Sequence, residues 1–332
     1  MKIAVIGAGS WGSALAIHLS RSGHDVGLWA RDPGVAERLR RENENGAYLP
    51  GHPFPPSVFV TADLDEALAG VELAVVSVPS HGLRSALRAA ALWLPPGVPV
   101  VSATKGLELG TLQRMSEVVA EEAGRTHPAV VLSGPSFAAE VARGRPTAVV
   151  VASADADALG AVQSHFGGRT LRVYGSADVV GVEMGGALKN VMAIAAGVVE
   201  SVGLGQNALA ALITRGLTEM SRLALAMGGQ RETLAGLSGL GDLVLTCTGT
   251  LSRNRHVGCE LGRGRPLAEI LAGMKMVAEG VHTTRAALTL GERHGVELPI
   301  TAQMQQVFDG KGVAAAVGEL MDRPQRAEAE SR

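Results

Sequence analysis

Short apolar runs alternate with helix-like patterns through the first half of the chain. Each run is rich in β-branched residues and is bounded by Gly, Pro or polar residues. These patterns predict strands at 2–6, 26–29, 73–78, 98–102, 129–133 and 148–152. Strands that alternate with helices form a doubly wound sheet whose strands run parallel. The first half is therefore expected to be an α/β domain.

Past residue 178 this alternation stops. Residues 179–202 are apolar on nearly every face, which predicts one long helix, and 207–227 predict a second, amphipathic one. Shorter helices are expected at 266–274, 282–294 and 300–309. No low-complexity linker separates the halves, so we expect an α/β domain at 1–178 and an all-α domain at 179–332, with a large interface and a cleft between them.

Length and composition agree with two soluble globular domains. A chain of 332 residues corresponds to two domains at about 150 residues each, and 46% of its residues are hydrophobic. Thirty Lys and Arg against 32 Asp and Glu leave a net charge of -2. Because no overall basic field exists to attract them, nucleic acid and anionic membranes are not expected partners.

Cysteine, histidine and apolar patterns narrow the class further. Cys247 and Cys259 are too few for a disulfide framework or a cysteine-based zinc site, which agrees with a cytoplasmic protein. No histidine spacing typical of a metal site occurs, so no metal is expected. The apolar run at 191–199 is shorter than the roughly 20 residues that cross a bilayer, so no membrane anchor is expected.

A glycine motif opens the chain. Gly7, Gly9 and Gly12 follow the strand predicted at 2–6 and begin a helix expected at 11–20. Gly7 would permit the tight turn, Gly9 the approach of a pyrophosphate and Gly12 close packing of helix on strand, while the helix N-terminus favours phosphate. The motif is weak by itself among 43 glycines. Its place between strand and helix predicts a dinucleotide site.

Arg31 and Asp32 end the second predicted strand, about 20 residues after the glycines. An acid at this position selects NAD through the ribose hydroxyls, whereas an arginine accommodates the extra phosphate of NADP. Arg31 comes first, so NADPH is favoured over NADH. The alternative is a solvated charge at the end of a strand.

Several polar residues occur where ligands or chemistry are expected. Lys105 follows the strand at 98–102, at the sheet edge where such folds bind ligands, although a solvated lysine is the simpler explanation. The turn at 133–138 offers small residues and backbone groups. The segment 252–256, Ser-Arg-Asn-Arg-His, is interpreted as a glycine-flanked loop suited to phosphate, or as a basic surface loop.

Lys189 lies inside the apolar helix at 179–202. Burial of an ammonium lowers its pKa, as acid-base work near neutral pH requires, whereas a lysine that extends its amine to solvent would have no such role. Asp242 lies between apolar residues, where it could pair with Lys189 or cap a helix.

Taken in order, these segments resemble the bacterial-type NAD(P)-dependent glycerol-3-phosphate dehydrogenases. The matching segments are GAGSWGSAL (7–15), NGAYLP (45–50), VPS (78–80), SATKGLE (102–108), SGPSFAAEV (133–141), GALKNV (186–191), ALITRG (211–216) and 240–258. The resemblance covers residues 1–320. It departs at Ser13, where the family has Thr, and at Leu209, where it has Arg.

The resemblance implies a Rossmann-type N-terminal domain and an all-α C-terminal domain like that of 6-phosphogluconate dehydrogenase. It implies reversible reduction of dihydroxyacetone phosphate to sn-glycerol 3-phosphate with NADPH or NADH, which would supply glycerophospholipid biosynthesis. It also implies a cytoplasmic homodimer.

Site residues follow from the same resemblance. Lys189 is expected to be the proton donor and acceptor, oriented by Asp242. The implied substrate contacts are Lys105, Gly134, Ser136, Lys189, Asp242, Ser252, Arg253 and Asn254. The implied cofactor contacts are Gly7, Gly9, Ser10, Trp11, Gly12, Arg31, Tyr48, Lys105, Ala138, Arg253, Val277 and Glu279.

Two alternatives share this architecture. One is a 3-hydroxyacid or 6-phosphogluconate-type dehydrogenase, whose substrates are carboxylates. The other is a non-catalytic NADPH-binding sensor, against which the presence of Lys189 and Asp242 argues. An assay that compares dihydroxyacetone phosphate with 3-hydroxy acids would separate these hypotheses.

Overall fold

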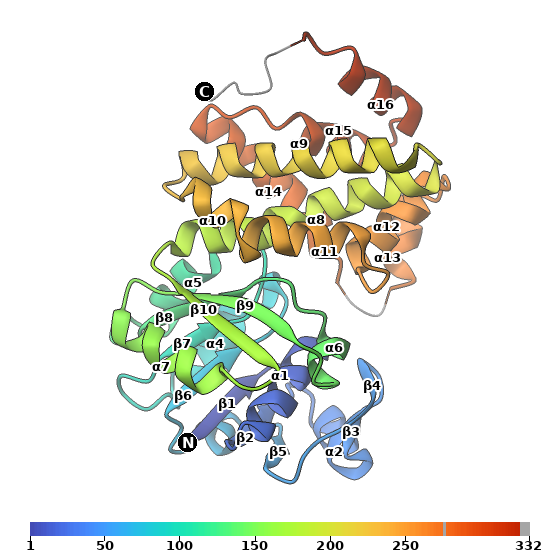
Figure 1. Ribbon diagram of the computed structural model, residues 1–332. Helices are drawn as coiled ribbons and strands as arrows, with labels where there is room; N and C mark the ends of the chain where they lie inside the picture. Colours follow the sequence, from blue (N-terminus) through green and yellow to red (C-terminus); the bar gives the residue numbers. More distant parts are fainter. Residues whose placement is uncertain (275–276, 326–332) are drawn as a thin grey trace.

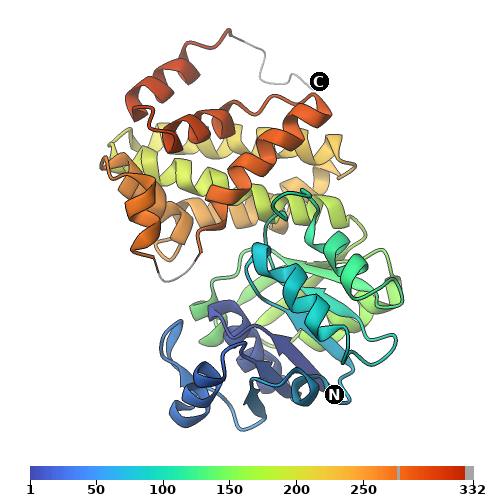
Figure 2. The same cartoon turned by 180° about the vertical axis from the view of Figure 1, so that it is seen from behind.

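The computed structural model describes residues 1–274 and 277–325. A sheet flanked by helices forms the N-terminal part, and the described residues that follow it are helical (Figure 1). Seen from behind, the same two parts are stacked along the long axis of the molecule (Figure 2). The last strand ends at Ser176 and the first long helix begins at Val179. The division into domains 1–178 and 179–332 stays a prediction, and its boundary falls between these two elements.

The sheet has eight strands in the order β10-β9-β8-β7-β6-β1-β2-β5. Their bounds are β1 Lys2–Ile6, β2 Asp25–Trp29, β5 Val58–Thr61, β6 Leu73–Val76, β7 Val100–Ser102, β8 Ala129–Ser133, β9 Thr147–Ala152 and β10 Leu171–Ser176. The six strands predicted from the sequence are confirmed, with ends that shift by two residues or fewer. The central pairing aligns Ile3 of β1 with Val26 of β2 and with Leu73 of β6.

The sheet differs from the prediction at its edges. β9 runs antiparallel to β8, so the expectation of parallel strands throughout is wrong at this pair. An apolar run has the same composition in either direction, so the sequence carries no sign of the reversal. The edge strands β5 and β10 and a separate hairpin, β3 (Glu44–Asn45) with β4 (Leu49–Pro53), were not predicted. Both edge strands are partly exposed; β10 has its apolar residues interrupted by Arg172, and the apolar run of β5 is only three residues long.

Helices cover both faces of the sheet because alternate residues of each central strand point to opposite faces. Ile3 and Val5 pack with Leu15 of α1 in one apolar cluster, whereas Ile6 packs with Leu83 of α4 in another. The helices of this part are α1 Ser10–Arg21, α2 Pro33–Glu42, α3 Leu64–Leu68, α4 Ser80–Ala90, α5 Met115–Glu122, α6 Ala138–Ala142 and α7 Ala156–Phe166.

The helical part is built around α8 (Val179–Ser201), which confirms the long helix predicted there. Its length and its mean hydropathy of 1.3 would suit a membrane span, but 89% of its most apolar stretch is buried inside the structure. It is therefore the core helix of this part. The surrounding elements are α9 Gly205–Ala226, α10 Arg231–Ala235, a π-helical turn η1 Leu237–Gly241, α11 Asp242–Thr248, α12 Arg253–Gly262, α13 Leu267–Ala272, α14 Glu279–His294, α15 Pro299–Phe308 and α16 Val313–Met321.

Candidate active site

Lys189 and Asp242 form a buried ion pair where the two parts meet. Lys189 lies in the middle of α8, and its Nζ donates to Asp242 Oδ1 at 2.5 Å and to Thr246 Oγ1 at 2.9 Å. Asp242 begins α11 and is 1% exposed. The predicted pairing of these residues is therefore confirmed, and the proposal of a lysine whose amine reaches solvent is wrong.

A second lysine reaches the same carboxylate from the sheet. Lys105 lies beyond the end of β7, and its Nζ donates to Asp242 Oδ2 at 2.7 Å and to the carbonyl of Gly134 at 2.9 Å. The same carbonyl accepts the hydroxyl of Ser136 at 2.9 Å. Gly134 has φ +114, a conformation that L side chains rarely adopt. The structure thus brings Lys105, Gly134 and Ser136 to Asp242 and Lys189.

The electrostatics of this cluster suit proton transfer. Burial lowers the pKa of Lys189 to about 7, the Asp242 carboxylate opposes this shift, and the positive charge of Lys105 adds to it. A lysine with this pKa can donate and accept a proton near neutral pH.

Thr246 was not predicted from the sequence. It lies one turn after Asp242 in α11, accepts from Lys189 and donates to the backbone carbonyl of Asp242 at 2.6 Å. The only sequence signal was its spacing, because residues four apart lie on the same helix face. The π-helical turn η1 precedes Asp242 and approaches α8 closely, since a Cβ added at Gly185 would lie 2.6 Å from the Ser238 carbonyl.

The segment predicted as a basic loop, 252–256, is instead the start of a helix. Ser252 caps α12 by accepting from the backbone N–H of Arg255 at 3.2 Å. Sequence reasoning missed the helix because its first turn is polar. The helix lies against α8 through glycines, since a Cβ added at Gly258 would lie 1.8 Å from the Ile194 carbonyl.

Two residues of α12 differ in the number of hydrogen bonds that their side chains make. Arg253 is exposed, and among the described residues its guanidinium has no hydrogen bond or ion pair. The Asn254 amide is buried, donating to Asn190 at 2.9 Å and accepting from the backbone of Gly280 at 3.0 Å. Arg253 is thus available to an anion, while Asn254 keeps one N–H for a ligand.

The glycine turn has the form that a dinucleotide pyrophosphate requires. Gly7 has φ +116, and a Cβ added at Gly12 would lie 1.9 Å from the Gly7 carbonyl, so a side chain at Gly12 would break the turn. A Cβ added at Gly9 would meet nothing within 4 Å, which leaves open space beside the N-terminus of α1. The residues present therefore fit a dinucleotide at this position.

The flanking cofactor candidates lie around this turn. Ser10 and Trp11 begin α1, and the indole Nε1 of Trp11 is buried with no partner among the described residues. Arg31 is exposed beyond β2, whereas the Asp32 carboxylate accepts from Val35 N at 3.0 Å and caps α2. The Asp32 carboxylate is thus engaged in capping α2, whereas the Arg31 side chain is exposed.

Asn45 holds the hairpin that carries Tyr48. Its buried amide donates to the Ala8 carbonyl at 3.0 Å and to the Ser13 hydroxyl at 2.9 Å, and its Oδ1 accepts from Tyr48 N at 3.2 Å. The residue was not singled out from the sequence. Ser13, a departure from the family pattern, still supplies a hydroxyl here.

The remaining cofactor candidates lie on α14, just before α14 and on α6. Glu279 begins α14 and accepts from Ser80 N at 3.1 Å and from Ser80 Oγ at 2.6 Å, so its carboxylate caps α4 from the helical part. Val277 precedes α14 and is half-buried, and Ala138 begins α6.

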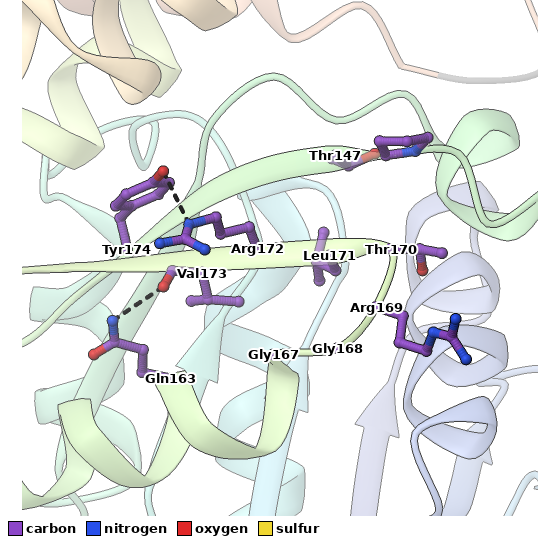
Figure 3. Close-up of a pocket in the computed structure, with 11 residues that line it drawn as sticks. Thr147, Gln163, Gly167, Gly168, Arg169, Thr170, Leu171, Arg172, Val173 and Tyr174 are labelled. Atoms are coloured by element: carbon purple, nitrogen blue, oxygen red, sulfur yellow. Dashed lines mark hydrogen bonds between the residues drawn. The ribbon is translucent and has the colours of Figure 1, made fainter.

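A surface groove of about 470 Å³ lies elsewhere, along β10. Arg169, Arg172 and Tyr174 are among its lining residues, and the Arg172 side chain lies beside the ring of Tyr174 (Figure 3). None of the predicted site residues lines this groove. The cluster around Asp242, not this groove, is the candidate active site.

Known families account for both parts of the chain. The model described as "NAD-dependent glycerol-3-phosphate dehydrogenase N-terminus" matches residues 2–159, and its C-terminal counterpart matches residues 178–318. A protein of Acidobacterium capsulatum named glycerol-3-phosphate dehydrogenase [NAD(P)+] is 54% identical, over 98% of this chain and 99% of its own. A protein of the same name from Moorella thermoacetica is 51% identical, over 99% and 98%.

Solved structures agree with these relatives. The glycerol-3-phosphate dehydrogenase of Coxiella burnetii is 41% identical and superposes with a TM-score of 0.93, over 97% of this chain and 99% of its own. The Saccharomyces cerevisiae enzyme of that name is 25% identical with a TM-score of 0.83, over 97% and 99%.

Proposed function

The chain belongs to the NAD-dependent glycerol-3-phosphate dehydrogenase family, and from this premise we propose which of its residues carry the reaction. The enzyme reduces dihydroxyacetone phosphate to sn-glycerol 3-phosphate, reversibly, with NAD(P)H. The proposed roles rest on one observation: one carboxylate oxygen of Asp242 accepts a hydrogen bond from Lys105 and the other accepts one from Lys189.

Lys189 is the proposed proton donor of the reduction and the proton acceptor of the reverse reaction. When bound, the dinucleotide supplies the two electrons that reduce the substrate carbonyl. Lys189 gives a proton to the carbonyl oxygen as negative charge develops there, and Asp242 holds its ammonium in place. Lys105 adds positive charge beside the same oxygen. The proposed substrate contacts are Lys105, Gly134, Ser136, Lys189, Asp242, Ser252, Arg253 and Asn254.

The substrate phosphate is proposed to bind at the start of α12. Arg253 offers an uncommitted guanidinium there, and Ser252 and Asn254 flank it. A phosphate held away from the reacting carbon contributes binding energy that positions the carbonyl.

The proposed cofactor contacts surround the glycine turn and extend to α14. They are Gly7, Gly9, Ser10, Trp11, Gly12, Arg31, Tyr48, Lys105, Ala138, Arg253, Val277 and Glu279. The open space at Gly9 and the position of Glu279 on the helical part support a dinucleotide that spans both parts.

A comparison of substrates tests the function. We expect the wild type to oxidise sn-glycerol 3-phosphate with NADP and NAD, and to leave a 3-hydroxy acid unchanged. Preferred turnover of the 3-hydroxy acid would establish the carboxylate dehydrogenase alternative, and dinucleotide binding with no turnover would establish the sensor.

NADPH is the proposed preferred cofactor, because Arg31 is exposed at the end of β2 and Asp32 is engaged in capping α2. The Arg31→Ala variant should show a higher KM for NADPH and a nearly unchanged KM for NADH, since only NADPH carries the extra phosphate. Steady-state kinetics with both cofactors measures this. Arg40→Ala, an exposed arginine of the same α2, is the control. Equal losses with both cofactors would contradict the assignment.

We also propose that the enzyme is a cytoplasmic homodimer that supplies glycerophospholipid biosynthesis. The family resemblance supports this, and the low net charge of -2 gives no reason for a membrane or nucleic-acid partner. Light scattering in solution should give twice the chain mass of 34.1 kDa, and a mass equal to one chain would exclude the dimer.

A further inference from the structure

Glu183 is a buried carboxylate of α8 that takes no part in the chemistry described above. It lies six residues before Lys189, and its side chain is 3% exposed. Its Oε1 accepts from Ser116 N at 2.7 Å. Its Oε2 accepts from Ser116 Oγ and from Arg114 Nη1, each at 2.7 Å. A buried carboxylate with three donors holds its neighbours firmly, because the loss of any donor leaves charge uncompensated.

One donor, Arg114, ends the segment that carries Lys105, and the other two belong to Ser116 in the helix that follows it. This segment, residues 103–114, is called the lysine loop here; it connects β7 to α5. Arg114 closes the loop and is also bonded to Glu117 at 2.7 Å, and Ser116 lies in the first turn of α5. Glu183 thus fastens α8, which carries Lys189, to the loop that carries Lys105.

The lysine loop is also fastened to its own part of the molecule. The Thr104 hydroxyl donates to the Val78 carbonyl at 2.7 Å, and Glu108 accepts from Arg84 at 2.7 and 2.8 Å. Close to Glu183, a small cavity of about 10 Å³ is bordered by Lys105, Glu183 and Gly186. Lys105 and Glu183 therefore border one cavity, and α8 lies against Lys105 three residues after Glu183, since a Cβ added at Gly186 would lie 3.6 Å from the Lys105 Cγ.

We propose that Glu183 is a positioning residue of the reaction, which sets the placement of Lys105 against Lys189 around Asp242 by clamping α8 to the lysine loop. The inference rests on the roles proposed above for the two lysines. Its physical basis is that Lys105 and Lys189 belong to different parts of the molecule, so their separation depends on the contacts that join those parts.

The Glu183→Gln variant tests the clamp while keeping the shape of the side chain. An amide has only one oxygen that can accept, so either Ser116 N or the two donors at Oε2 would face an N–H₂ group. We expect kcat for dihydroxyacetone phosphate reduction to fall about tenfold, because small misplacements of catalytic groups cost rate.

The pH dependence of kcat/KM separates the proposed role from a structural one, because a loss of stability alone would not shift it. Asp242, Thr246 and Lys105 face Lys189, and the buried thiol of Cys247 lies near it with its pKa raised by burial to about 12. If Lys105 moves away, its lowering effect on the pKa of Lys189 weakens, so the alkaline limb of kcat/KM should move to higher pH. The loss of the negative charge of Glu183 would by itself move that limb in the opposite direction.

Glu219 provides a matched control. It is 3% exposed, and its carboxylate accepts from Ile300 N at 2.8 Å, Thr301 N at 3.0 Å and Thr301 Oγ1 at 2.5 Å, so it too caps a helix. It joins α9 to α15, far from the sheet (Figure 1). Glu219→Gln should lower the melting temperature as Glu183→Gln does, but leave kcat and the alkaline limb unchanged.

Ser116→Ala is the milder second variant, because it removes one donor and keeps the charge of Glu183. It should move kcat and the alkaline limb in the same direction by a smaller amount. The inference is overturned if the folded Glu183→Gln and Ser116→Ala enzymes both match Glu219→Gln in kcat and pH profile. If a Lys189→Ala enzyme instead kept full activity, the result would contradict the proposed role of Lys189 as proton donor, on which this inference rests.

Discussion

Replacement of Lys189 by alanine should lower kcat for dihydroxyacetone phosphate reduction by at least about 100-fold, the lower range for loss of a general acid. The proton that the developing alkoxide requires would then have to come from water. Dinucleotide binding should persist, because the glycine turn lies on α1 and is independent of α8. Stopped-flow kinetics and NADPH fluorescence titration measure the two quantities.

Lys189→Arg separates charge from proton transfer. A guanidinium keeps the positive charge but does not release its proton near neutral pH, so this variant should lose nearly as much activity. Lys311→Ala, a lysine of the helical part outside the site, is the control. A folded Lys189→Ala enzyme with near-normal kcat would contradict the assignment.

The wild-type pH profile follows from the same assignment. Reduction requires a protonated Lys189, and burial lowers its pKa to about 7. The kcat/KM for dihydroxyacetone phosphate should therefore fall as pH rises through about 7, while oxidation of glycerol 3-phosphate, which requires the neutral amine, should rise over the same range. Both limbs should be absent from the residual activity of Lys189→Ala.

Replacement of Arg253 by alanine should reduce kcat/KM for dihydroxyacetone phosphate by about 10- to 200-fold, since a hydrogen bond to a charged group contributes roughly 1.5 to 3 kcal/mol. Arg253 begins α12, and among the described residues its guanidinium makes no hydrogen bond or ion pair, so its removal leaves the phosphate without its proposed clamp. Arg263→Ala, at the other end of the same helix and 62% exposed, should have little effect.

Unphosphorylated dihydroxyacetone makes this test sharper. The wild type should turn it over very poorly, because it lacks the anion that anchors the substrate. Removal of Arg253 should reduce the difference in kcat/KM between dihydroxyacetone phosphate and dihydroxyacetone. If both substrates lose activity by the same factor, Arg253 acts through the cofactor or the fold, and the phosphate site must be sought at Lys105.

Local sequence patterns were sufficient to predict a structural element wherever one short segment determines its own conformation. The glycines of the first turn could be interpreted because only glycine adopts φ +116 at Gly7 and permits the close approach at Gly12. α8 was predictable because an apolar run of this length can only be a buried core or a membrane span. α12 was not, because its polar first turn depends on the Ser252 cap and on packing against α8 for stability.

The sequence by itself determined the two-part architecture, the central strands, the dinucleotide turn and the unusual burial of Lys189, because periodicity and glycine placement are local properties. Only the tertiary structure decided that Lys105 and Lys189 share the carboxylate of Asp242, that Thr246 joins them, and that β9 is reversed. It also decided that Glu183 receives its three bonds from Arg114, at the end of the lysine loop, and from Ser116 in the first turn of α5. These contacts join residues far apart in the chain, so they form only in the folded tertiary structure.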